Sequence, residues 1–221
     1  ELMKIALVMA LARYFHCLSD EDTLKLKSLF KPMVLIILPV ILVLRQPDLG
    51  TTLLIVMGGI ALLFAAGVRM WLFIFSFIAL IPAAFGAWQF LKPYQKQRVL
   101  TFLDPEKDPL GAGYHIIQSK IALGSGGVYG KGFIQGTQSQ LNFLPEKHTD
   151  FIFTVIAEEL GLIGGLSLLC LYLILLGYAM IVSVSVKSQF GRLMVLGMVV
   201  TFFLYMFINI AMVMGLLPVV G

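Results

Sequence analysis

The sequence predicts an all-α polytopic membrane domain with about six helices that cross the bilayer. Hydrophobic residues make up 59% of the 221 positions, charged residues only 13%, and the mean hydropathy is +0.96. A soluble domain of this length needs far more charge on its surface. None of the long apolar runs alternates apolar with polar residues, as the strands of a membrane barrel do, so helices are expected.

Apolar runs mark the expected helices. They cover residues 2–15, 33–45, 49–67, 71–91, 151–183 and 193–217. The run at 33–45 is short for a membrane span and contains Pro39, so we expect it to be kinked or to extend back through Leu29. The chain begins at Glu1 without a leader-like segment and ends directly after an apolar run. We therefore interpret residues 1–221 as an internal fragment that forms a single membrane domain.

The connections between these runs alternate between the two sides of the membrane. Residues 16–32, 68–70 and 184–192 fall on one side, and residues 46–48 and 92–150 fall on the other. Lys and Arg occur on both sides, so the positive-inside rule does not orient the chain clearly. Because long loops are translocated largely regardless of charge, we expect the short connections to be cytoplasmic and the long loop to be extracytoplasmic.

The long loop at 92–150 has a pattern of its own. It contains an amphipathic run at 114–123, which is followed by the glycines Gly124, Gly126, Gly127, Gly130 and Gly132. A long ordered loop is usually functional, and glycine lets a backbone bend sharply or approach a ligand closely. We expect this loop to fold back onto the membrane; a flexible loop without a site is the alternative.

Asp150 is the first candidate for chemistry. It stands where the charged run 146–149 meets the apolar run 151–183. An ionisable group at the mouth of a membrane helix is seldom kept without a use, and an acid near a hydrogen-bond partner such as His148 suits a general base. The alternative is that Asp150 only caps the helix and complements its dipole.

Three more charged residues are candidates on the same side as Asp150. Asp48 occupies a tight turn before a helix, where a capping or turn residue is the simpler interpretation. Glu1 and Lys4 stand three residues apart on one helical face. They form either a buried ion pair or part of a cavity in which Lys4 could meet an anionic group.

The long loop also carries basic residues that could bind phosphate or diphosphate. These are Lys96, Arg98, Lys120 and Lys131, and Arg98 is the strongest candidate. A solvated charged face is the alternative for each. Glu158 lies about 12 Å beyond Asp150 along the expected helix. It could share a cavity with Asp150 or satisfy a buried partner such as Asn209.

Several kinds of site have no signal in this sequence. No set of His, Cys, Asp and Glu has metal-ligand spacing, and no Ser-His-Asp arrangement, P-loop or GxGxxG motif is present. No cofactor is therefore firmly expected, although a loosely held divalent cation, Mg²⁺ or Mn²⁺, stays open. The chain also lacks the basic and aromatic pattern of a nucleic-acid interface, so nucleic acid is not an expected partner.

A series of motifs resembles the SEDS family of bacterial cell-wall proteins, which includes RodA, FtsW and SpoVE. The motifs are Gln-Pro-Asp-Leu-Gly-Thr at 46–51, then 95–99, 104–114, 118–122 and 144–161, and they occur in order over the whole chain. The segments 124–127 and 136–141 resemble the elongation branch of the family, that of RodA, more than the division branch. The resemblance implies a fold of about ten helices, of which this chain supplies the fourth to the ninth, with the long loop outside.

The resemblance also implies an activity. Members of the family are peptidoglycan glycosyltransferases, which join lipid II units into glycan strands and release undecaprenyl diphosphate. Asp150 matches the family's essential aspartate. Glu1, Lys4, Asp48 and Arg98 match positions that line its proposed cavity.

Location and partners follow from the same resemblance. It implies the bacterial inner membrane, with a class B penicillin-binding protein and the elongation machinery as partners. A lipid flippase is one alternative, but a flippase is expected to carry polar residues through the full depth of the membrane, and here the ionisable residues cluster on the outer side. A scaffold for the penicillin-binding protein is the other alternative, and that role can coexist with catalysis.

Overall fold

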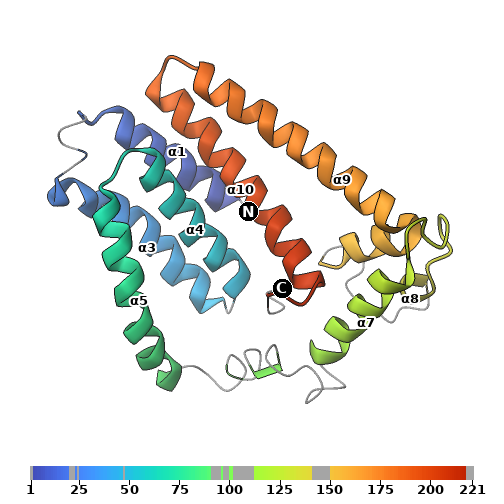
Figure 1. Ribbon diagram of the computed structural model, residues 1–221. Coiled ribbons are helices and arrows are strands. Elements are labelled where there is room, and N and C mark those ends of the chain that lie inside the picture. The colour runs from blue at the N-terminus through green and yellow to red at the C-terminus, as the bar shows by residue number, and fades with distance from the viewer. Residues whose placement is uncertain are drawn as a thin grey trace. The chain divides into compact units, whose positions relative to one another are not determined.

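The computed structural model describes residues 2–19, 23, 25–46, 48–90, 96, 100–101, 112–140 and 150–217. Its helices are α1 (Leu2–His16), the 3-10 helix η1 (Leu26–Leu29), α3 (Phe30–Arg45), α4 (Leu49–Ala65), α5 (Met70–Phe90), α7 (Ala112–Ser125), α8 (Thr137–Gln140), α9 (Ile152–Ser185) and α10 (Gln189–Val213) (Figure 1). Within these described residues every regular element is helical, which confirms the predicted class.

Each predicted apolar run falls largely on a helix, although one of them, α9, is interrupted. The run expected at 33–45 begins earlier, because α3 starts at Phe30 directly after η1 and contains the buried Pro39. The extension back through Leu29 is therefore confirmed. In the described part of the chain, three stretches are long and apolar enough to cross a membrane: Leu26–Arg45, Ile152–Ser185 and Gln189–Val213.

The chain divides into two compact units. Unit 1 comprises Glu1–Gln89 and Leu175–Tyr205, and unit 2 comprises Phe90–Ile174 and Met206–Gly221. Unit 1 thus holds α1 to α5, and unit 2 holds α7 and α8, while α9 and α10 each contribute one part to each unit. The expectation of a single membrane domain stays a prediction.

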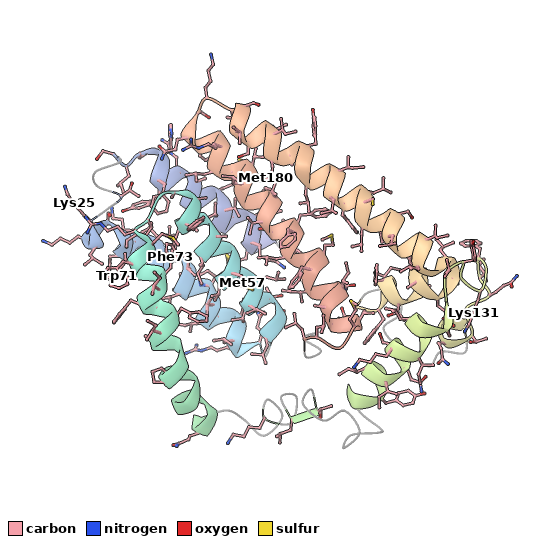
Figure 2. All side chains as sticks on the ribbon, viewed as in Figure 1. Lys25, Met57, Trp71, Phe73, Lys131 and Met180 are labelled. Atoms are coloured by element: carbon pink, nitrogen blue, oxygen red, sulfur yellow. The ribbon has the colours of Figure 1, made fainter. Side chains whose placement is uncertain are left out.

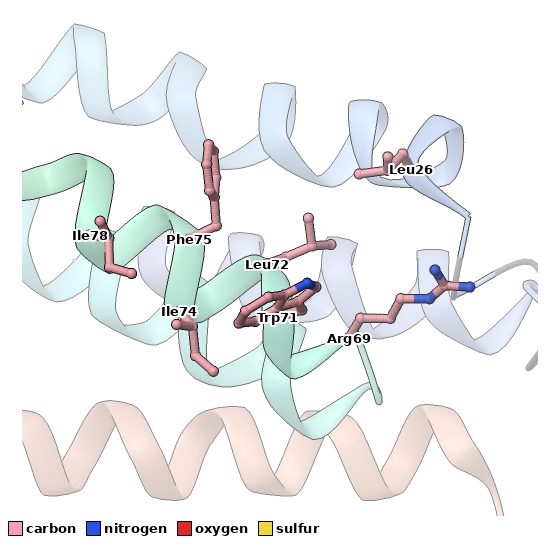
Figure 3. Close-up of a pocket in the computed structure, with 7 residues that line it drawn as sticks. All are labelled: Leu26, Arg69, Trp71, Leu72, Ile74, Phe75 and Ile78. Atoms are coloured by element: carbon pink, nitrogen blue, oxygen red, sulfur yellow. The ribbon is translucent and has the colours of Figure 1, made fainter.

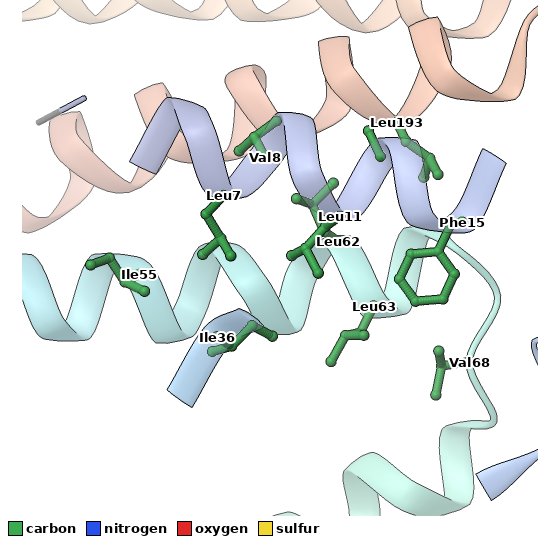
Figure 4. Close-up of a cluster of buried hydrophobic side chains, with 11 residues drawn as sticks. Leu7, Val8, Leu11, Phe15, Ile36, Ile55, Leu62, Leu63, Val68 and Leu193 are labelled. Carbon is green, nitrogen blue, oxygen red and sulfur yellow. The ribbon is translucent and has the colours of Figure 1, made fainter. Parts of the chain in front are cut away.

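The core of unit 1 is built around α1. Leu7, Leu11 and Phe15 are buried, and their spacing places them on one face of the helix. They pack in one cluster with Leu62 of α4 and Leu193 of α10 (Figure 4). Many large apolar side chains elsewhere on these helices are exposed. Such a distribution suits helices that are surrounded by lipid, since lipid tails are as apolar as leucine.

The two ends of unit 1 agree with the predicted alternation of connections. The rings of His16 and Phe190 have centroids 6.3 Å apart, and the Tyr14 hydroxyl donates to the Ser28 carbonyl over 2.6 Å. Val68 packs in the same cluster as the end of α1. The connections after α1, after α4 and before α10 therefore lie at one end of this unit, and the turn between α3 and α4 lies at the other.

In unit 2, α9 is broken at Gly161. This residue has a φ of 67° and a ψ of −162°, which are not helical angles. In an unbroken helix the amides of Leu162 and Ile163 would donate to the carbonyls of Glu158 and Glu159. The predicted continuous helix is therefore wrong at this point, and four backbone groups need other partners.

The glycine-rich loop, residues 126–132, supplies those partners. Four backbone hydrogen bonds join it to α9: Leu162 to the Gly127 carbonyl (2.9 Å), Ile163 to the Val128 carbonyl (3.2 Å), Lys131 to the Glu158 carbonyl (3.0 Å) and Gly132 to the Glu159 carbonyl (3.0 Å). A Cβ atom at Gly126 or Gly130 would overlap a carbonyl oxygen of α9. Only glycine therefore allows this approach, and the group approached is the backbone of α9 rather than the ligand that the sequence suggested.

An apolar pocket of about 360 Å³ lies in unit 1 between η1 and α5 (Figure 3). Leu26, Leu72 and Phe75 are among its lining residues, and Arg69 lies at one end of it. None of the predicted site residues lines this pocket. Its lining suits an apolar neighbour in the membrane, and the candidate chemistry lies elsewhere.

Candidate active site

Asp150 lies in the turn that precedes α9 and is half-buried. Helix α9 begins at Ile152, and the Phe151 carbonyl accepts hydrogen bonds from the amides of Thr154 (3.0 Å) and Val155 (3.3 Å). Phe151 therefore holds the N-cap position, and Asp150 precedes it by one residue. This placement does not favour the interpretation of Asp150 as a simple helix cap.

The backbone at Asp150 is anchored to α10. Asn209 Nδ2 donates to the Asp150 carbonyl over 3.0 Å. Asn209, which the sequence offered as a partner for Glu158, thus holds the backbone of Asp150 instead. The next residue, Phe151, is buried against Val213 of α10. Both contacts restrict where the Asp150 carboxylate can be placed.

A pair of buried hydroxyls joins α7, α9 and α10 close to Asp150 in the sequence of α9, at Thr154. Ser119 Oγ of α7 lies 3.1 Å from Thr154 Oγ1 of α9 and donates to the Val213 carbonyl of α10 over 2.9 Å. Ser119 and Thr154 are fully buried. A buried donor that finds no acceptor is costly, so these hydroxyls favour one arrangement of α7, α9 and α10 around the turn.

Glu158 is fully buried and forms an ion pair with the glycine-rich loop. Its Oε1 lies 2.8 Å from Lys131 Nζ and accepts from Thr137 Oγ1 (3.3 Å) and the Gln138 amide (2.9 Å). The side chain of Lys131 is 26% exposed and that of Glu158 is 0% exposed. Figure 2 shows the side chain of Lys131 on the glycine-rich loop. A buried carboxylate is tolerated because it is paired and hydrogen-bonded.

Lys4 lies in unit 1 and is also buried, with a relative exposure of 4%. Its Nζ lies 4.2 Å from the centroid of the Tyr205 ring, an arrangement typical of a cation–π interaction. Lys4 also stabilises the charge of Asp48. The structure therefore brings Lys4 and Asp48 into one electrostatic environment. Glu1, its predicted neighbour, lies outside the described residues.

Asp48 caps α4, which confirms the simpler of its two interpretations. Its carboxylate accepts from the Thr51 amide over 2.9 Å. Burial by itself would raise the pKa of Asp48, but hydrogen bonds from Thr51 and Gly50 and the positive charge of Lys4 outweigh burial. The pKa of Asp48 is lowered from its ordinary value of 3.8, so the carboxylate is ionised at neutral pH.

The remaining candidates are placed less fully. Lys120 is exposed on α7, beside the turn at Gly215. Lys96 is half-buried. Arg98 and His148 lie outside the described residues. The described residues contain no group of three or more His, Cys, Asp and Glu side chains that could hold a metal ion. The loosely held divalent cation stays a prediction, as do the substrate contacts of these residues.

Some residues of these sites were not singled out in the sequence. Thr137, Gln138 and Tyr205 were missed, and Lys131 was not recognised as the partner of Glu158. Gly161 was the available signal for these contacts. An isolated glycine within a helical pattern, together with the glycines of the loop, indicates that the two backbones approach each other closely. No local pattern marked Tyr205, because its contact joins distant parts of the chain.

The long apolar helices, and the loop inserted against a broken helix, define a polytopic helical membrane protein with a local polar site in each of its two units. A family model described as "Cell cycle protein", which covers FtsW, RodA and SpoVE, matches residues 1–221. The chain belongs to this family, which is the SEDS family that its motifs resemble.

Curated relatives agree with this assignment. The chain is 50% identical over 223 residues to "Peptidoglycan glycosyltransferase MrdB" of Escherichia coli K12, covering 100% of this chain and 60% of that protein. It is 38% identical over 224 residues to "Probable peptidoglycan glycosyltransferase FtsW" of Idiomarina loihiensis, covering 100% of this chain and 54% of that protein. The chain thus spans little more than half the length of these relatives.

A solved structure supports the fold. It is described as "Structural coordination of polymerization and crosslinking by a peptidoglycan synthase complex". The match has a TM-score of 0.78 and 30% sequence identity, and it covers 99% of this chain and 60% of the other chain. The fold predicted from the sequence is therefore confirmed as the helical membrane fold of this family.

Proposed function

We propose that this chain is the central part of a peptidoglycan glycosyltransferase that polymerises lipid II into glycan strands during cell elongation. The observation that carries the proposal is the half-buried carboxylate of Asp150, whose backbone is anchored at the start of α9, in a chain 50% identical to MrdB over its whole length. The proposed location is the bacterial inner membrane, with the long loop outside.

In the proposed reaction Asp150 acts as the general base. It accepts the proton of an acceptor sugar hydroxyl while the hydroxyl oxygen attacks the anomeric carbon of the donor. The bond from that carbon to the diphosphate breaks, and undecaprenyl diphosphate leaves with the bonding electrons. Cationic side chains stabilise the negative charge that develops on the leaving group.

The proposed substrate contacts are the predicted charged residues, Asp48 among them, and His148. Lys4 is supported by its burial near the ionised Asp48, because the positive charge of an ammonium attracts an anionic group. Glu1, Lys96, Arg98, Lys120 and His148 complete the proposed set. A divalent cation that bridges the diphosphate is compatible with this chemistry, because Mg²⁺ is usually bound through one or two carboxylates plus substrate phosphates.

The proposed partners are a class B penicillin-binding protein and the elongation machinery. The similar solved structure is described as a complex in which polymerization and crosslinking are coordinated. A polymerase whose glycan strands are crosslinked by a second enzyme is expected to bind that enzyme. The 50% identity to MrdB supports the elongation branch over the division branch, to whose member from Idiomarina loihiensis the identity is 38%.

The test is lipid II polymerisation by the full-length protein, reconstituted with its penicillin-binding partner. Asp150→Asn keeps the size of the side chain and removes its basicity, so we expect the rate to fall at least about 100-fold. Asp22→Asn, on the predicted cytoplasmic side, is the matched control and should polymerise normally. Wild-type rates from Asp150→Asn would contradict the assignment of the base. No strands from wild type would favour the flippase or the scaffold.

A further inference from the structure

The carboxylate of Glu158 is the meeting point of three segments. Its Oε1 accepts hydrogen bonds from Lys131 Nζ of the glycine-rich loop, from the Thr137 hydroxyl at the start of α8 and from the Gln138 amide. Lys131 Nζ also donates to Thr137 Oγ1 over 2.8 Å. Loop, α8 and α9 are therefore joined through one carboxylate group, in addition to the backbone bonds at the break in α9.

Helix α8 has little to hold it in place by itself. It has four residues, Thr137–Gln140, and a helix of one turn is not stable alone. Within the described residues, Gln138 Oε1 is buried without a hydrogen-bond partner, which opposes this placement. The bonds to Glu158 are the polar interactions that favour it.

The break in α9 depends on the same contact. The Glu158 carbonyl accepts from the Lys131 amide while the Glu158 carboxylate binds the Lys131 ammonium, so the two residues meet through backbone and side chain. This double contact fixes which residues of the loop lie opposite which residues of α9. A shift of the loop by one residue along α9 would leave the buried Glu158 carboxylate without its partner.

Asp150 is connected to this contact from two directions. It lies in the turn before α9, and Glu158 follows it by eight residues, near the break at Gly161. The glycine-rich loop also follows α7, whose Ser119 Oγ lies 3.1 Å from Thr154 Oγ1 in the first turn of α9. The Asn209 bond holds the backbone at the start of this part of α9, and the Glu158 bonds hold its end before the break.

We propose that the Lys131–Glu158 ion pair is a positioning device for Asp150: it holds the glycine-rich loop and α8 on α9 and thereby fixes the part of α9 before Gly161, at whose start Asp150 lies. The inference rests on the proposed role of Asp150. Glu158 acts through other residues, because its fully buried carboxylate is occupied by protein groups.

The first experiment measures loop anchoring without any activity. Hydrogen exchange is followed in the full-length protein for wild type, Lys131→Met and Glu158→Gln. We expect peptides that cover 126–138 to exchange at least about 10-fold faster in both variants, because each loses the charge-assisted bonds. Glu159→Gln, the neighbouring buried acid, is the control and should exchange like wild type. Unchanged exchange in Glu158→Gln would overturn the proposal.

The second experiment links the pair to Asp150. In lipid II polymerisation we expect Glu158→Gln and Lys131→Met to lower kcat about 10-fold with little change in KM, because the substrate contacts remain while the base is displaced. The double variant should lose no more than either single variant, since both remove one interaction. A loosened loop with wild-type kcat would overturn the link to Asp150.

The outcomes separate this inference from the proposed function. If wild type lacks polymerase activity, the proposed function fails and with it the link to Asp150, while the exchange experiment still decides whether the pair anchors the loop. If Glu158→Gln does not fold, Thr137→Ala removes the bonds that an exposed side chain makes with Glu158 and Lys131. It should speed exchange of 126–138 by a few fold, and wild-type exchange in this variant would contradict the anchoring role.

Discussion

At the scale of the residue, the charged side chains of this protein are held by different means. Asp48 is stabilised as an anion by amide donors and by the charge of Lys4. Glu158 is buried and paired with Lys131. The backbone of Asp150 is held by Asn209. Asp150 is half-buried beside α9, whose N-cap residue is Phe151. Of these three carboxylates, Asp150 is the one that we propose as the base.

The capping role of Asp48 gives the first prediction. Asp48→Ala removes the acceptor for the Thr51 amide and should cost about 1 kcal/mol of stability, whereas Asp48→Asn keeps a cap and should cost less. Thermal unfolding of the full-length protein in detergent measures the difference. A melting temperature of Asp48→Ala equal to that of wild type would contradict the structural cap.

The lowered pKa of Asp48 gives that comparison a pH dependence. A carboxyl whose folded pKa is below its ordinary value stabilises the fold above that value and loses this contribution as pH falls through the folded pKa. The difference between wild type and Asp48→Asn should therefore be constant above about pH 5 and should vanish as the pH falls below 3.8. A difference that grows in acid would contradict the lowered pKa.

Lys4 gives a prediction about substrate binding. Lys4→Met should weaken lipid II binding about 10-fold, because a charged donor to the diphosphate is lost. Tyr205→Phe keeps the ring and should bind normally, while Tyr205→Leu should weaken binding a few fold. Titration of lipid II into nanodiscs that contain the full-length protein measures each affinity. Lys187→Met, on the predicted cytoplasmic side, is the control; unchanged binding by Lys4→Met would contradict the assignment.

At the scale of the element, the break in α9 is the feature that organises unit 2. A membrane helix normally satisfies its own backbone, and non-helical backbone is tolerated where it is buried in protein. Here the glycine-rich loop supplies the missing donors and acceptors at 158–163. The break is therefore stable only while the loop is docked.

Gly161 gives the prediction for this element. Gly161→Ala places a Cβ at a positive φ and against backbone atoms of Gly130 and Val128, so we expect a loss of at least about 2 kcal/mol and a displaced loop. Gly177→Ala lies in the same helix with nothing within 4 Å of the added atom, and should be neutral or stabilising. Thermal unfolding of both variants makes the comparison. Equal stability of the two would contradict the requirement for glycine at the break.

At the scale of the whole molecule, the helices carry two kinds of surface. Long apolar faces are exposed along the membrane stretches, while Lys4, Ser119, Thr154 and Glu158 are buried in the two local sites. The expected orientation places the glycine-rich loop outside and the connection after α1 inside. That orientation rests on the length of the loop, because Lys and Arg are divided between both sides.

Cysteine labelling tests the orientation. In a Cys170→Ser background, Thr137→Cys should react with a membrane-impermeant maleimide on spheroplasts, since Thr137 is exposed on the predicted outer side. Cys17 is also exposed, in the connection after α1, and should react only after the membrane is disrupted. The reverse pattern would invert the proposed topology.

Much of this protein follows from local sequence pattern. Apolar runs locate the membrane helices because any helix in lipid must be apolar along its length, whatever its neighbours. The cap at Asp48 follows from the preference for an acceptor before a helix, and the helix at 112–125 follows from its amphipathic run. Asp150 was singled out as a candidate base because a charge at the start of a membrane helix is costly wherever it occurs.

Only the tertiary structure decided which polar groups meet. Glu158 pairs with Lys131, 27 residues away, and Ser119 reaches the Val213 carbonyl, 94 residues away. Neither distance is encoded in a local period, because such contacts depend on how helices pack and on the break at Gly161. A buried charge accepts whichever partner the fold brings near it. The sequence by itself therefore determined the helices and the candidate base, and packing decided what holds that base in place.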